Sequence, residues 1–330
     1  MFDFKNMKKM HLQAAVLLGT LFVFLISNFI FADGPLNFIP PLIGAIIVVE
    51  IFVFVGMEVK AGAVKHGWKH EVLDTLVALV VAVAIWYGAS FILNTETPIS
   101  GVVSCSMLPN LQRGDFVLVH GSPIAAYEIE MTREELESLN DKAEITYGNK
   151  SATIKGSVFS YCVFNRHTDM CQAFVKSPDE FVEKKGPFTY SYDRCPMTYS
   201  NGSQASQPCV TSVSFKGKEY LANFSNDIMI FNPPQTDYYS LIGDIVHRTM
   251  FKINVDGKYY YLTRGDNNPI LDIQIYNYQN DLENKPVPEE NVRGKVVLRI
   301  PILGYFKLFL SGYLQEDPQC RTQLEFPTAG

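Results

Sequence analysis

The sequence predicts a mainly β domain with antiparallel strands and an α/β insertion, anchored by N-terminal transmembrane helices. Two observations carry this prediction. Roughly the first hundred residues are dense in Leu, Val, Ile and Phe, whereas the rest has short apolar runs separated by Gly, Asp, Asn and Pro. The chain of 330 residues is long enough to form a membrane part and a globular part.

Three long apolar runs define the membrane part. They are Leu12–Ala32, Leu36–Met57 and Leu73–Leu93, and each is long enough to cross a hydrocarbon core of ~30 Å as a helix. Positive loops stay in the cytoplasm, and lysines gather before the first run and between the second and third: Lys5, Lys8, Lys9, Lys60, Lys65 and Lys69. We therefore expect a multi-pass protein of the lipid bilayer. Its N-terminus would be cytoplasmic and everything after the third run extracytoplasmic.

The globular part carries two features of exported proteins. Three glycosylation sequons begin at Asn149, Asn201 and Asn223. Four cysteines lie close together, and an even cluster in an exported segment predicts two disulfides, with three alternative pairings. These cysteines are Cys162, Cys171, Cys195 and Cys209.

Composition and motif content exclude several classes of function. The net charge is −6 and no long basic block is present, so nucleic acid is not an expected partner, because its binders concentrate positive charge in a patch. The cysteine cluster lacks the CxxC pair that is typical of zinc sites. We therefore expect neither a bound metal nor a cofactor.

The globular part is predicted to form a β core interrupted by an insertion. The clearest strand-like runs are Phe116–His120, Asp227–Phe231, Ile245–Val255, Lys258–Arg264 and Gly294–Ile300. The run Thr132–Asn140 is the one segment that reads as helical. This helix, the sequons and the clustered cysteines occupy 122–225, which we interpret as an inserted subdomain. The core is then expected over 96–121 and 226–314, with a C-terminal tail over 315–330.

A serine, a histidine and two aspartates are candidates for nucleophilic chemistry. Ser106 lies in Ser-Cys-Ser-Met-Leu-Pro, beginning at Ser104, and a serine hydroxyl needs a neighbouring base to act as a nucleophile. Of the histidines predicted to be extracytoplasmic, His247 sits on a strand, which holds an imidazole rigidly. Asp266 and Asp272 follow the next strand, and either one is a candidate for the acid that orients the imidazole.

These motifs, in this order, resemble type I signal peptidases of the archaeal and endoplasmic-reticulum branch. The resemblance rests on Ser-x-Ser-Met-x-Pro-x-Leu-x-x-Gly-Asp, Asp-Ile-Val-His-Arg, Gly-Asp-Asn-Asn with a later Asp, and a strand around Asp227–Phe231. It implies that Ser106 is the nucleophile, that His247 is the general base, and that Asp272 is the acid, with Asp266 in support. It also implies that Ser104 helps the Ser106 N–H to bind the oxyanion.

The resemblance implies a membrane-bound serine endopeptidase. Such an enzyme removes N-terminal signal peptides from exported preproteins after small residues at positions −1 and −3. We expect the peptide to pair with Ile99–Val103, with contacts from Ile99, Val102 and Val103. The expected partners are signal-peptide-bearing preproteins, the bilayer and the protein translocation channel.

Two departures from the family pattern leave alternatives open. Cys105 stands where the family usually has Gly, and a catalytically impaired scaffold or binding protein is the alternative function. Three spans and a long insertion favour an archaeal cell-membrane enzyme, and the alternative location is the endoplasmic-reticulum membrane with a lumenal catalytic domain.

Overall fold

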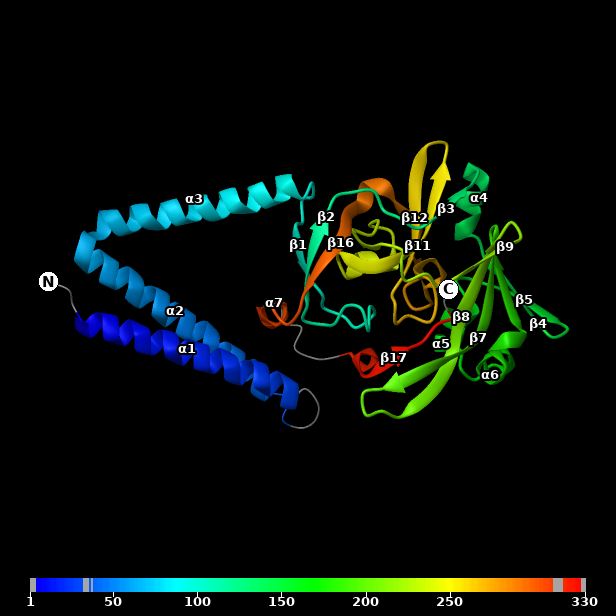
Figure 1. Cartoon of the computed structure of the whole chain (residues 1–330). Helices are drawn as coiled ribbons and strands as arrows, with labels where there is room; N and C mark the ends of the chain where they lie inside the picture. The colour runs from blue at the N-terminus through cyan, green and yellow to red at the C-terminus, as the bar shows by residue number, and fades with distance from the viewer. Residues whose placement is uncertain (1–3, 32–35, 37, 311–316, 328–330) are drawn as a thin grey trace. The chain divides into compact units, whose positions relative to one another are not determined.

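The computed structural model describes residues 4–31, 36, 38–310 and 317–327. Contacts between its elements divide the chain into two compact units. The first consists of Met1–Ile92 with Tyr305–Glu316, and the second of Leu93–Gly304 with Asp317–Gly330. The helices of the first and the strands of the second are drawn in Figure 1.

The first unit is helical, with α2 (Ile39–His66) in contact with α1 (Phe4–Ile30), α3 (Trp68–Ile92) and α7 (Tyr305–Leu310). Gly67 ends α2 with a positive φ of 85°, a conformation that costs glycine little.

Two helices in the described part of the chain are long and apolar enough to cross a membrane, and they overlap the second and third predicted spans. Among the described residues these are Leu42–His66 and Trp68–Ile92, and the apolar stretch found in α1, Leu12–Phe24, is shorter. The two helices indicate a membrane protein. The first predicted span stays a prediction, and its last residue, Ala32, lies outside the described residues.

The second unit is built on a central sheet of eight strands. Their order is β1-β2-β16-β10-β11-β12-β15, with β3 added in parallel to β11. The bounds are β1 Ile99–Gly101, β2 Phe116–His120, β3 Tyr127–Glu130, β10 Ile228–Phe231, β11 Ile245–Val255, β12 Lys258–Arg264, β15 Val287–Pro288 and β16 Val292–Ile300. All five strands expected from sequence are present, and the sheet is mainly antiparallel.

A second sheet fills most of the predicted insertion. Its order is β5-β4-β6-β7-β8-β9, and β17 pairs with β7. The bounds are β4 Ala143–Tyr147, β5 Lys150–Ile154, β6 Phe181–Lys185, β7 Phe188–Tyr199, β8 Gln204–Phe215, β9 Lys218–Leu221 and β17 Thr322–Leu324. The predicted tail therefore contributes a strand, and β3, from within the predicted insertion, joins the central sheet. Likewise 305–310, assigned to the β core from sequence, forms α7; 311–316 lie outside the described residues.

The insertion contains more helix than the sequence indicated. The predicted helix appears as α4 (Arg133–Glu137) followed by a 3-10 turn, and Thr132 caps it through a capping box. Two further short helices, α5 (Val158–Phe164) and α6 (Asp169–Lys176), were not predicted. Their N-caps, Ser157 and Thr168, each accept a backbone N–H three residues on, and this spacing of capping residues was the available sequence signal.

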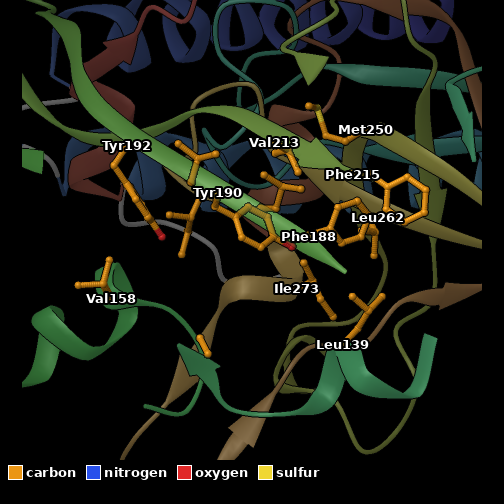
Figure 2. Close-up of a cluster of buried hydrophobic side chains, with 14 of the residues drawn as sticks. Leu139, Val158, Phe188, Tyr190, Tyr192, Val213, Phe215, Met250, Leu262 and Ile273 are labelled. Atoms are coloured by element: carbon orange, nitrogen blue, oxygen red, sulfur yellow. The ribbon is translucent and has the colours of Figure 1, made fainter. Parts of the chain in front are cut away.

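One apolar core joins the two sheets. Met250 and Leu262 of the central sheet lie in the same buried cluster as Phe188, Tyr190 and Val213 of the insertion (Figure 2). Because the two sheets share one core, the insertion is part of the unit that carries the candidate site and can position residues in it.

Three disulfides are present among the described residues. Cys162–Cys171 and Cys195–Cys209 select one of the three pairings left open by the sequence. The third, Cys105–Cys320, was not foreseen and joins the residue before Ser106 to the C-terminal segment. The chain has six cysteines, and an even total in an exported domain was the signal for a third bridge.

Candidate active site

Ser106 lies in the loop between β1 and β2. The side chains of Met107 and Leu111 are buried in an apolar cluster with Val102 and Val117, and they fix the loop against the central sheet. The Ser106 side chain is only half-buried. Its hydroxyl is therefore held by a packed loop and remains accessible.

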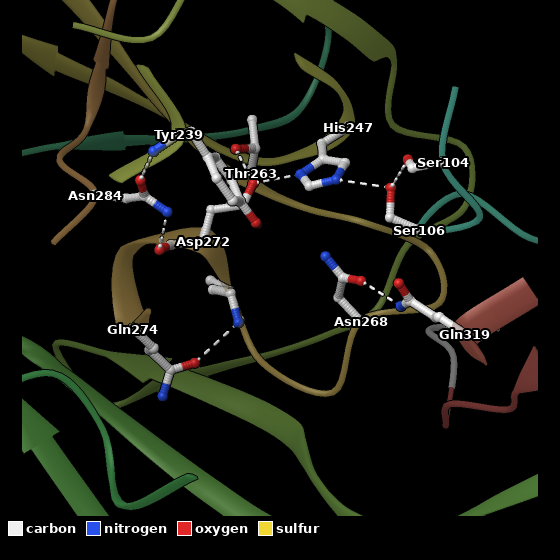
Figure 3. A network of polar contacts seen from close by, with 11 residues as sticks. Ser104, Ser106, Tyr239, His247, Thr263, Asn268, Asp272, Gln274, Asn284 and Gln319 are labelled. Atoms are coloured by element: carbon white, nitrogen blue, oxygen red, sulfur yellow. Dashed lines mark hydrogen bonds and ion pairs between the residues drawn. The ribbon is translucent and has the colours of Figure 1, made fainter. Parts of the chain in front are cut away.

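His247 is held on β11, opposite Met229 of β10. Its side chain is 5% exposed, and the imidazole Nε2 lies 3.0 Å from Ser106 Oγ. Figure 3 shows the ring between the serine and the carboxylate of Asp272. This distance allows direct proton transfer between the hydroxyl and the imidazole.

Asp272 begins the 3-10 turn η4 (Asp272–Gln274) and receives three side-chain donors. Its Oδ2 lies 2.6 Å from His247 Nδ1 and accepts a hydrogen bond from Thr263 Oγ1 at 2.6 Å. Its Oδ1 accepts a hydrogen bond from the Tyr239 hydroxyl at 3.1 Å. Burial, reinforced by the Asp272 carboxylate, raises the pKa of Tyr239 well above its ordinary value, so this hydroxyl stays protonated and remains a donor.

Asp266, the second candidate acid, is bonded to a different partner. Its two oxygens accept hydrogen bonds from Nε and an Nη of Arg248, both at 2.7 Å, and Oδ2 also accepts one from Asn110. The Arg248 guanidinium further donates to the carbonyls of Phe224 and Asn226. The structure thus pairs Asp272 with the imidazole and Asp266 with the arginine, and the expectation that Asp266 supports the imidazole has no direct contact behind it.

The loop after β12 is tied to the loop that carries Ser106. A Cβ on Gly265 would lie 2.6 Å from the Ser106 carbonyl oxygen, so the close approach requires glycine. The Asn267 backbone N–H donates to that same carbonyl at 2.7 Å, and its side-chain amide donates to the carbonyls of Cys105 and Thr322. Together with Cys105–Cys320, these contacts join the nucleophile loop to the C-terminal segment.

The remaining predicted site residues differ in how accessible they are to a substrate. Ser104 is exposed, with its Oγ 3.1 Å from Ser106 Oγ. Ile99 is 43% exposed on β1, an edge strand, and Val103 is half-buried. Val102 is not free to bind a peptide, because its side chain is buried and its N–H and C=O are bonded to the backbone of Asp115 and Gly114.

The insertion holds the turn that carries Asp272. The Gln274 amide donates to Glu183 Oε1 at 2.8 Å, and the Lys185 amine donates to the Ile273 carbonyl at 3.1 Å. Ser160 Oγ donates to the Gln274 carbonyl at 3.0 Å. Burial raises the pKa of Glu183 and lowers the pKa of Lys185, as expected for ionisable groups removed from water.

The raised pKa of Glu183 predicts a pH-dependent stability. The protonated carboxyl adds to the stability of the folded state, and this contribution is fully present below its ordinary pKa of 4.5. It is lost as the pH rises through the higher pKa of the folded state, where the buried group must ionise. We expect the free energy of unfolding of the wild type, minus that of Glu183→Gln, to fall as the pH rises above that ordinary value, by up to about 1.4 kcal/mol per pH unit. Urea titrations of both proteins from about pH 4 to 8 measure this difference. A difference that grows with pH would contradict it.

Similarity to known proteins agrees with the motifs at a coarse level. No protein-family model matches the chain. A stretch of 99 residues is 33% identical to the signal peptidase complex catalytic subunit SEC11 of Pyricularia oryzae. The similarity is to the signal peptidase family. It covers 30% of this chain and 49% of the relative, so the chain spans about half the length of the curated relative it matches.

Sequence reasoning missed several residues that shape the site. Thr263 and Tyr239 donate to Asp272, and no local pattern marks them, because each reaches the carboxylate from a different part of the chain. Arg248 could have been found from the sequence, because it directly follows His247 on a predicted strand. A buried arginine needs a carboxylate partner, and Asp266 was available in the sequence to be that partner.

Proposed function

We propose that this protein is a membrane-bound serine endopeptidase that removes N-terminal signal peptides from exported preproteins. The observation that carries the proposal is the line of contacts from Ser106 Oγ to His247 Nε2, at 3.0 Å, and from His247 Nδ1 to Asp272 Oδ2, at 2.6 Å. This is the arrangement by which a base activates a serine and an acid orients that base. The distant similarity to a signal peptidase catalytic subunit supports the substrate class.

In the proposed mechanism His247 Nε2 takes the Ser106 proton while the oxygen attacks the scissile carbonyl. Asp272 accepts the Nδ1–H bond, fixes the tautomer and stabilises the imidazolium. The imidazolium then gives its proton to the leaving amine, and the acyl-enzyme is hydrolysed when His247 activates a water molecule. The Ser106 N–H and the Ser104 hydroxyl stabilise the oxyanion.

The proposal places this chemistry on the extracytoplasmic side of a multi-pass protein with a cytoplasmic N-terminus. The lysines flanking the predicted spans support this orientation, and Cys162–Cys171, Cys195–Cys209 and Cys105–Cys320 are typical of an oxidising compartment. The proposed partners are preproteins, the bilayer and the translocation channel.

A cleavage assay tests the proposal. Full-length protein in detergent is incubated with preproteins that carry Ala at positions −1 and −3, and mass spectrometry identifies the new N-terminus. We expect one cut immediately after the −1 residue. A matched preprotein with a bulky charged residue at −1 should remain intact. Equal processing of both substrates, or processing of neither, would argue against a signal peptidase.

Ser104 provides a second test of the mechanism. Its hydroxyl lies 3.1 Å from Ser106 Oγ and is exposed, so Ser104→Ala removes a donor without opening a core cavity. We expect kcat to fall by about 10²–10³-fold with a small change in KM, since an oxyanion donor acts mainly in the transition state. Ser104→Thr keeps the hydroxyl and should recover much of the rate. If Ser104→Ala raised KM and left kcat unchanged, Ser104 would contribute to binding of the substrate and not to stabilising the transition state.

A further inference from the structure

A pocket of about 440 Å³ opens beside the candidate catalytic residues. Ser106 and His247 both contribute to its lining. The other walls are mostly apolar and come mainly from three parts of the second unit: α5, the segment around Tyr238–Ile242, and the chain on either side of η4. Pockets of about 300–1,000 Å³ with this character are typical of ligand sites.

The pocket is much larger than the expected small substrate residues require. An alanine side chain is a single methyl group and would leave most of this volume empty. Ile99, Val102 and Val103, the predicted contacts for the peptide strand, are not part of the lining. The lining of the pocket therefore does not include the stretch expected to meet positions −1 and −3.

Large apolar side chains are left exposed at the pocket. On α5, Val163 is 47% exposed and Phe164 is 39% exposed, and Ile242, which also lines the pocket, is 51% exposed. Exposed apolar groups gathered around a concavity mark a binding surface more often than a solvent-facing one. These apolar side chains line the same pocket as Ser106 and His247. The occupant that fits is therefore a part of the substrate.

The α5 wall is fixed before any substrate arrives. Cys162 of α5 is bonded to Cys171 of α6, and the buried Ser160 hydroxyl donates to the Gln274 carbonyl. The N–H of Val158 donates to Glu183 Oε2 at 2.9 Å. A preformed apolar wall gives selectivity at low entropic cost, since little has to be ordered on binding.

Resting on the proposed function, we infer that this pocket binds one large apolar or aromatic side chain of the substrate, close to the scissile bond and outside positions −1 and −3. The α5 helix of the insertion is the determinant of this preference. The substrate class is thus a preprotein with small residues at −1 and −3 and a bulky apolar residue at one further position near the cut.

Substrate scanning tests the inference. Preproteins keep Ala at −1 and −3, while each of the positions −4, −2, +1 and +2 is set in turn to Ala, Leu or Phe. With the full-length protein in detergent, we expect Phe or Leu to raise kcat/KM about 10–200-fold over Ala at one position, which is the range that apolar pockets give. Values within about twofold at every position would overturn the inference.

Matched variants then assign the preference to the pocket. Val163→Trp fills it, and Phe164→Ala removes part of its wall. Both should reduce the ratio of kcat/KM for the Phe substrate to that for the Ala substrate. Val175→Trp is the control, because Val175 is an exposed valine on α6 outside the lining. An unchanged ratio in both pocket variants would overturn the inference, and thermal unfolding checks that each variant is folded.

The two proposals fail in distinguishable ways. Cleavage of the all-Ala substrate without any size preference would leave the proposed function intact and remove the pocket's role. Absence of cleavage for every substrate would overturn the proposed function and this inference with it.

Discussion

Replacing Ser106 by Ala is expected to lower kcat for preprotein cleavage by about 10⁶-fold, with little change in thermal stability. The reason is that the Ser106 hydroxyl is the atom proposed to attack the substrate, and it lies 3.0 Å from the only base that touches it among the described residues, His247 Nε2. The hydroxyl is half-buried, so its removal leaves the packed loop intact. Quantification of mature product over time measures the effect.

Two companion variants sharpen this test. His247→Ala should cost about as much as Ser106→Ala, and the double variant little more, because the residues of a catalytic unit act together. Ser122→Ala, in the loop after β2 and outside the hydrogen-bonded site, is the matched control and should keep wild-type activity. Undiminished cleavage by Ser106→Ala would show that Ser106 is not the nucleophile. Additive losses of rate in the double variant would show that Ser106 and His247 do not act as one catalytic unit.

Asp272→Asn is expected to lower kcat by about 10⁴-fold. An asparagine of the same shape can present its NH₂ group to Nδ1, and the imidazole would then be held in the tautomer that cannot take the Ser106 proton. The carboxylate it replaces lies 2.6 Å from His247 Nδ1, and its side chain is only 6% exposed. Single-turnover cleavage rates report the loss at the chemical step.

Asp266→Asn is the matched control for this prediction. Asp266 holds Arg248 through two hydrogen bonds of 2.7 Å, and both side chains are buried. Breaking a buried ion pair costs about 3–5 kcal/mol because the remaining charge is left uncompensated. We expect Asp266→Asn to lower the free energy of unfolding by that amount and to reduce the rate per folded molecule far less than Asp272→Asn. The opposite pattern would exchange the roles of the two aspartates.

The insertion has a structural role beside its proposed part in selectivity. Glu183, Lys185 and Ser160 all reach the turn that begins at Asp272. The position of the acid therefore depends on a subdomain that carries none of the motifs on which the resemblance to signal peptidases rests. These hydrogen bonds and the shared apolar core make the large insertion part of the same packed unit as the candidate site.

Local patterns in the sequence determined much of this protein. Alternating and β-branched runs between turn residues located β2, β10, β11, β12 and β16, and apolar length located α2 and α3. The motifs singled out Ser106 and His247 as well, because their residue types and order along the chain are visible without any contact. These are properties of short segments, and they can be recognised from residue type and spacing without knowledge of tertiary contacts.

The resemblance favoured Asp272 as the acid, but only the tertiary structure shows which distant residues meet. His247 and Arg248 are neighbours on β11, and successive side chains on a strand point to opposite faces. His247 is consequently met by Asp272 and Arg248 by Asp266, a choice that depends on how the loop after β12 returns to each face. The pairing of Cys105 with Cys320 and the pocket wall formed by α5 arise in the same way, since each depends on the packing of segments far apart in the chain, which no local pattern records.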